Sequence, residues 1–122
     1  MNQPRQPNAI VVKRAYEPAA KGDGCRVLVD GLWPRGLSKE RVHAEHWFKD
    51  LAPSASLRRW YGHEESRWPE FRRRYFAELK DHREELDALL AMAAGRRLTL
   101  VYGARDEQHN NAVALRDYLQ KH

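Results

Sequence analysis

The chain has 122 residues, a formal net charge of +5 at pH 7 and a single cysteine. This length suits one domain with its own core, and no apolar run is long enough to span a bilayer. The N-terminus lacks the basic-then-apolar pattern of a secretory signal, and Cys25 alone cannot form an internal disulfide. We therefore expect a cytoplasmic protein with no membrane segment.

Sixteen of the 22 basic residues are Arg. An Arg-rich chain fits an anionic partner, because the planar guanidinium binds phosphates, carboxylates and nucleic acids through paired hydrogen bonds. A biased genome composition and a charged surface facing water explain the same count, and this second interpretation is the stronger one. Composition alone therefore names no partner.

The first part of the chain predicts two strands. Residues 1–8 contain two Pro and are predicted to form a flexible arm. Residues 9–122 are predicted to form a single domain. Ile10–Val12 is the first strand, with its direction left open. Val27–Val29 is apolar throughout, so it should be buried on both faces at the centre of a sheet.

Short helices should follow. Ser38 is a good N-cap for a helix that runs through His43, and 44–51 continues that helix or opens another. Residues 54–61 predict a two-turn helix with Ser54 as its cap.

The remaining chain predicts one long helix, a strand and a last helix. Apolar residues recur at steps of three or four, or sums of these, from Trp68 to Ala93, which indicates one helix that ends at Gly95. Residues 98–102 form the third strand, and Asp106 should cap the final helix. Together the elements predict a small single-domain α/β protein with a sheet of about three mostly parallel strands packed by helices.

Four long segments carry a family resemblance: RVLVDGLWPRGLSKE at 26–40, WFKDLAPSASLRRWYGH at 47–63, FRRRY at 71–75 and VYGARDEQHNNAVAL at 101–115. On these the chain resembles the YeaO-like family, a bacterial domain of unknown function numbered 488. The resemblance implies no established activity. It also marks two departures, Gly31 where an Arg is usual and Cys25 where an aromatic residue is usual, so neither a guanidinium nor a thiol nucleophile is implied there.

Polar residues follow the second and third predicted strands. If these strands are parallel neighbours, their exits meet at one end of the sheet, where open α/β sheets bind ligands. The candidate catalytic groups for acid–base chemistry are Asp30, Asp106 and His109. The candidate groups for binding a small anionic ligand are Trp33, Arg35, Arg105 and Asn110.

The same residues fit a purely structural role equally well. In it Asp30 pairs with Arg35 or Arg105 to lock the corners, and Asp106 is only a helix cap. A capping carboxylate would also occupy the N–H groups that a phosphate needs, which disfavours phosphate.

Two further functions remain open. A nucleic-acid-binding accessory protein or transcriptional regulator would use an Arg-rich face made by Arg58, Arg59, Arg67, Arg72, Arg73 and Arg74. An interaction module without catalysis would show an exposed apolar patch. His43 and His46 are three apart, but with no third ligand we expect exposed histidines and no metal. No nucleotide-binding motif is present, so no cofactor is predicted.

Overall fold

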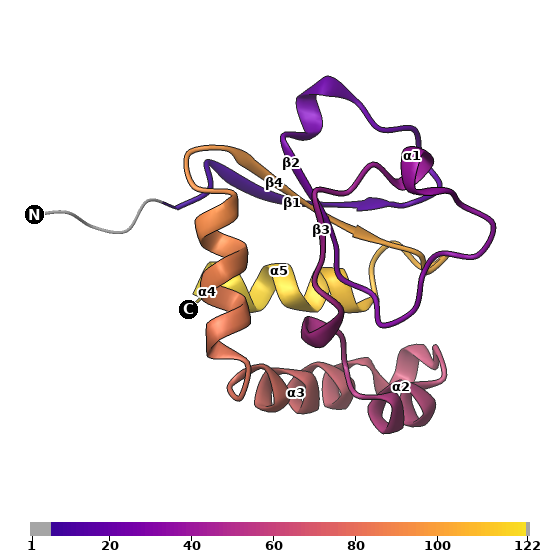
Figure 1. Ribbon diagram of the computed structural model, residues 1–122. Helices are drawn as coiled ribbons and strands as arrows, with labels where there is room; N and C mark the ends of the chain where they lie inside the picture. Colours follow the sequence, from indigo (N-terminus) through magenta and orange to yellow (C-terminus); the bar gives the residue numbers. More distant parts are fainter. Residues whose placement is uncertain (1–5, 122) are drawn as a thin grey trace, which may run out of the picture.

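Four parallel strands form one sheet in the computed structural model, which describes residues 6–121 (Figure 1). The strands are β1 Ala9–Arg14, β2 Cys25–Leu28, β3 His46–Trp47 and β4 Arg97–Tyr102. Their order is β1-β4-β2-β3, and every neighbouring pair is parallel. The predicted parallel α/β sheet is therefore confirmed, with one strand more than expected and with the direction of the first strand decided.

The added strand, β3, lies inside the segment 44–51 that was predicted to be helical, so that prediction was wrong. β3 pairs with the end of β2, and a 3-10 turn over Lys49–Leu51 follows it. The indole N–H of Trp47 donates to the main-chain carbonyl of Asp30 at 2.6 Å. This contact with a distant segment favours extended backbone, and a two-residue edge strand leaves little periodic signal in the sequence.

The part of the domain that the structure describes also holds five α-helices: α1 Lys39–Val42, α2 Ala55–Tyr61, α3 Trp68–Leu79, α4 Arg83–Met92 and α5 Asn111–Lys121. The predicted caps of the two short helices are confirmed. The Ser38 hydroxyl accepts from the Arg41 N–H at 3.1 Å, and the Ser54 hydroxyl accepts from the Leu57 N–H at 3.2 Å. Gly62 ends α2 in the left-handed conformation, with φ of 52°.

The single long helix predicted up to Gly95 is two helices, α3 and α4, so that prediction was also wrong. The chain turns at 80–82, within a polar run that carries no apolar residue between Leu79 and Leu86. Because no apolar side chain of this stretch packs against the core over nearly two turns, no packing contact keeps the chain on the axis of α3. The turn lets α4 leave α3 at a steep angle and run back toward the sheet (Figure 1).

The sheet separates two unequal cores. The larger one lies on the face covered by α5, with α3 beyond it, and α1 lies on the opposite side of the sheet (Figure 1). The smaller core joins Leu28 and Val101 of the sheet to Val42 of α1, with Trp33 and Trp47 packed against it. Within the described residues, no helix is both long enough and apolar enough to cross a membrane.

The predicted arm over 1–8 lies mostly outside the described residues, which begin at Gln6. Gln6 and Asn8 are hydrogen-bonded to the segment before β4. The Gln6 carbonyl accepts from the Gly95 N–H at 3.0 Å, and the Asn8 N–H donates to the Arg96 carbonyl at 2.7 Å. These bonds continue the ladder between β1 and β4 by a few residues.

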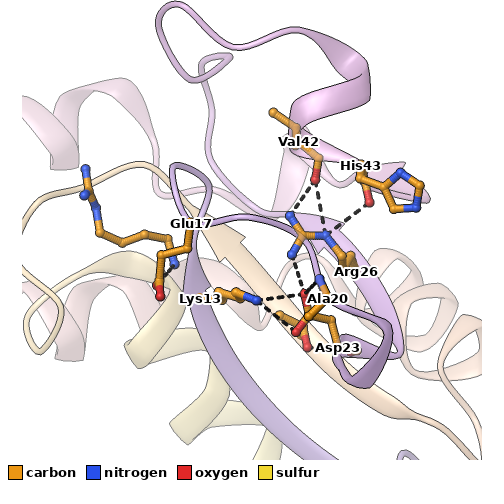
Figure 2. Close-up of polar contacts among 9 residues, drawn as sticks. Lys13, Glu17, Ala20, Asp23, Arg26, Val42 and His43 are labelled. Atoms are coloured by element: carbon orange, nitrogen blue, oxygen red, sulfur yellow. Dashed lines mark hydrogen bonds and ion pairs between the residues drawn. The ribbon is translucent and has the colours of Figure 1, made fainter.

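Arg26 is a buried charge near the start of β2, with only 2% of its surface exposed (Figure 2). Its guanidinium donates to the Asp23 carboxylate at 2.7 Å and to the carbonyls of Val42 and His43, at the end of α1. Asp23 also accepts from the Lys13 ammonium at 3.0 Å. The network ties β1, β2 and α1 together, and the C-terminal end of a helix favours a cation.

We expect Arg26→Met to lower the free energy of unfolding by about 3 kcal/mol, because it leaves two carbonyls and a carboxylate without their buried donor. Urea unfolding measures this loss. Arg83→Met is the matched control, since Arg83 is exposed and should change stability by less than about 0.5 kcal/mol. Equal losses for the two variants would contradict a structural role for the Arg26 network.

Candidate functional site

Asp30 joins the exits of β2 and β4. One of its carboxylate oxygens accepts from the Gly103 N–H at 2.8 Å, directly after β4. The other accepts from the side-chain amide of Asn111, the first residue of α5, at 3.1 Å. The two exits therefore meet at one end of the sheet, as the sequence predicted. Within the described chain Asp30 forms no ion pair with Arg35 or Arg105, so the predicted corner pairing was wrong.

Asp30 is half-buried, and burial raises the pKa of its carboxyl. The hydrogen bonds from Asn111 and Gly103 and the positive charge of Arg58 oppose this rise in part. A buried carboxylate is costly unless donors surround it, and here a main-chain N–H and an amide supply them. Asp30 is thus a structural acceptor that also forms part of a cavity wall.

A cavity of about 330 Å³ opens beside Asp30. Five of the seven predicted site residues line it: Asp30, Trp33, Arg35, His109 and Asn110. The loop after β2 forms one wall, and the loop between β4 and α5 forms another. Polar groups and aromatic rings therefore share one hollow at the carboxyl ends of the two central strands.

The other two predicted residues lie away from the cavity surface. Arg105 is exposed and does not line the cavity. Asp106 lies behind His109, where its carboxylate is 3.1 Å from the imidazole Nδ1 and accepts from the His109 N–H at 3.0 Å. A hydrogen bond from the Gln108 N–H is the largest influence that holds the pKa of Asp106 below its usual range.

Asn110, and not Asp106, caps α5, so the prediction for the cap of the last helix was wrong. The Asn110 side chain accepts from the Val113 N–H at 2.9 Å and donates to the Asp106 carbonyl at 2.8 Å. Asp106 stabilises the loop before the helix. Asp and Asn are equally good caps, so the four-residue difference in position depends on how the loop folds.

His109 is held from several sides. Its ring packs edge-on against Trp68 at 5.5 Å between centroids, and its carbonyl accepts from the Tyr61 hydroxyl at 2.8 Å. Burial raises the pKa of Tyr61 to about 12, so this phenol stays protonated. The Nε2 atom of His109 lies 3.9 Å from a carboxylate oxygen of Glu65. Asp106 and Glu65 therefore flank the two ring nitrogens.

Arg58 is a charged site residue that the prediction missed. It comes from α2 and lines the cavity, but the sequence placed it on the Arg-rich face. Its side chain forms no hydrogen bond or ion pair with any described residue, and its Nε is a buried donor without a partner. The guanidinium lies against Gly31, where an added Cβ would be 2.9 Å from its Nη1. No periodic signal distinguishes Arg58 from Arg59; only the missing side chain at Gly31 hinted at space nearby.

The rest of the Arg-rich face is largely paired within the protein. Arg72 bridges to Asp117 at 3.2 Å, and both Arg73 and Arg74 bridge to Glu70. Arg67 and Arg74 also stack over the ring of Trp60, at 5.4 and 4.4 Å from its centroid. Pairing with carboxylates reduces the positive field available to a phosphate backbone. Nucleic-acid binding by this face stays a prediction.

The histidine pair does not share a helix face. α1 ends at Val42, His43 follows it with a left-handed φ of 51°, and His46 begins β3. Both side chains are exposed. Across residues 6–121 no group of three or more His, Cys, Asp or Glu side chains is arranged to hold a metal ion. Cys25 is fully buried at the start of β2, and burial raises the pKa of its thiol.

These features define a small parallel α/β domain with a polar cavity where its central strands end. The model of a family described as "Inactive DUF488-N3 subclade" matches residues 9–122. The chain therefore belongs to the DUF488 family, which confirms the YeaO-like resemblance of its motifs.

Two uncharacterised bacterial proteins show the extent of the similarity. The uncharacterized protein YeaO of Escherichia coli (strain K12) is 40% identical over 111 residues, which cover 91% of this chain and 96% of that protein. The uncharacterized protein Rv3073c of Mycobacterium tuberculosis (strain ATCC 25618 / H37Rv) is 47% identical over 72 residues, 59% of this chain and 61% of that protein. No solved structure matches the chain.

We expect Asp30→Asn to lower the free energy of unfolding at neutral pH by about 1–3 kcal/mol, because an amide cannot accept from both Gly103 and Asn111. The pH dependence has a definite sign. Since burial raises the pKa of Asp30 in the folded state, the stability that this carboxyl contributes is greatest below its unfolded pKa of about 3.9. That contribution falls as pH rises through the folded pKa.

Urea unfolding of both proteins across this pH range measures the effect. The difference in unfolding free energy between the native protein and Asp30→Asn should shrink with rising pH and then level off. A difference that grows with pH would show that the pKa of Asp30 is lowered by folding instead.

Proposed function

We propose that the cavity binds a small anionic ligand, with the Arg58 guanidinium as its main cationic contact. The observation that carries this proposal is that Arg58 lines the cavity with a free positive charge and an unsatisfied buried Nε. A buried donor without an acceptor costs about 1–3 kcal/mol, which an anion bound at the guanidinium would reduce. By contrast, Arg67, Arg72 and Arg74 have carboxylate or aromatic partners.

The remaining predicted residues take supporting roles in this proposal. Trp33 and Asn110 form walls, and Arg35 adds positive charge at the exposed rim. Asp30 fixes the two loops that form the cavity.

Acid–base catalysis on that ligand stays a prediction. It would use His109 Nε2 as the proton-exchanging atom, with Asp106 holding Nδ1, and this geometry fits such a pair. Among the described residues that line the cavity there is no Ser, Thr or Cys to act as a nucleophile. The matching family model is described as an inactive subclade, which favours binding without turnover.

A thermal-shift experiment tests the proposal with four sodium salts as probes: acetate, benzoate, phosphate and sulfate. At least one anion should raise the melting temperature in a saturable way, by a few degrees at about 100 times its Kd. Arg58→Met should abolish the shift. Arg59→Met is the matched control and should keep it, because Arg59 is the exposed neighbour of Arg58 on the same helix. Shifts that are equal in all three proteins would contradict a binding role for Arg58.

A further inference from the structure

Two main-chain features that usually bind phosphate are occupied by the protein's own acceptors in this cavity. The N–H of Gly103, in the turn after β4, donates to Asp30. At the N-terminus of α5 the Asn110 side chain accepts from the Val113 N–H. Glycine-rich turns and helix N-termini bind phosphate when their N–H groups are free. These two N–H groups are therefore not available to a phosphate.

The charges near the cavity floor suit a monoanion. Arg58 supplies one unpaired guanidinium, and it lies close enough to Asp30 to influence that carboxyl. A phosphate dianion needs more positive charge than one guanidinium beside a carboxyl provides, and Arg35 is an exposed rim residue. A carboxylate carries a single charge and matches the planar fork of a guanidinium through two parallel hydrogen bonds.

Part of the cavity wall is apolar or aromatic. Trp33, Pro53, Tyr61 and Phe71 line it, and Leu32 stands at the mouth with 69% of its surface exposed. Ring faces of this kind hold a flat apolar group well. A volume of about 330 Å³ is at the small end of the range for ligand pockets, so the apolar group is the size of a ring and not of an extended chain.

We propose that the ligand of this cavity is a small carboxylate with an apolar, ring-sized body. The carboxylate pairs with Arg58, and the body lies among Trp33, Tyr61 and Phe71. This inference rests on the proposed function and narrows the chemical class of its ligand.

Gly31 is the positioning residue for this pairing. A Cβ at this position would lie 2.9 Å from Arg58 Nη1 and 3.4 Å from the Ala52 Cβ. Gly31 has no left-handed φ, so alanine fits its backbone, and the atom that must move is the end of a flexible side chain. Gly31→Ala should therefore shift the Arg58 guanidinium while leaving the fold intact.

Four probes test the contributions of the ligand's charged group and of its apolar body to binding: phenylacetate, phenyl phosphate, acetate and 2-phenylethanol. Each is titrated into 15N-labelled full-length protein, and the amide signals of Gly31 and Gly103 report on the cavity. A ligand of this size binds with Kd on the order of 1 mM, so the titrations extend to about 10 mM. Phenylacetate should bind about tenfold more tightly than each of the other three.

Variants then test the residues. Arg58→Met and Gly31→Ala should each weaken phenylacetate binding about tenfold. Arg58→Lys should bind phenylacetate more tightly than Arg58→Met, because lysine keeps the positive charge but lacks the planar fork of the guanidinium. Arg59→Met should bind like the native protein. Urea unfolding of each variant confirms that it is folded, so a loss of binding in a folded variant is a loss of ligand contact.

The outcomes distinguish this inference from the proposed function. Tightest binding by phenyl phosphate, still dependent on Arg58, would overturn the carboxylate assignment and leave anion binding in place. Acetate binding as tightly as phenylacetate would overturn the apolar body. Arg58-independent binding of every probe, or no binding by any, would overturn both proposals.

Discussion

The Asp30 carboxylate is the interaction on which the site depends. It follows β2 directly, and it accepts one hydrogen bond from the turn after β4 and one from the start of α5. Asp30 is 73 residues from Gly103 and 81 from Asn111 in the chain, and its single side chain holds these segments in register. The cavity lies between two loops that leave neighbouring parallel strands. Asp30 joins these loops where they leave the strands.

Two buried or half-buried guanidiniums near β2 differ in how they are satisfied. Arg26 directs its donors to a carboxylate and to the carbonyls at the end of α1, so the protein itself meets its needs. Arg58 lies against Gly31 with no acceptor among the described residues. A satisfied buried charge explains a fold, whereas an unsatisfied one beside a cavity points to a group from outside the chain. This contrast is the basis of the proposal that Arg58 binds an anion, whereas Arg26 has a structural role.

Local sequence signals predicted most elements correctly where one segment contains the whole cause. Ser38, Ser54 and Gly62 mark helix ends through bonds within a few residues, and the apolar run at β2 marks a central strand. The failures have causes outside their own segments. β3 is extended because it pairs with β2 and because Trp47 reaches Asp30. The predicted long helix is broken at 80–82, because α4 turns back toward the sheet there. The spacing of the apolar residues does not predict this turn.

The sequence by itself determined the class of fold, its motifs and a polar site after two strands, because hydrophobic periodicity and strand-ending residues are local properties. Of the residues it predicted for that site, Asp30, Trp33, Arg35, His109 and Asn110 line the cavity. Only the tertiary structure decided that Asp30 bonds to Gly103 and Asn111, that Asn110 caps α5, and that Arg58 lines the cavity. Adjacent arginines look alike in a sequence. Their roles differ because helix packing turns one toward Gly31 and the other toward water.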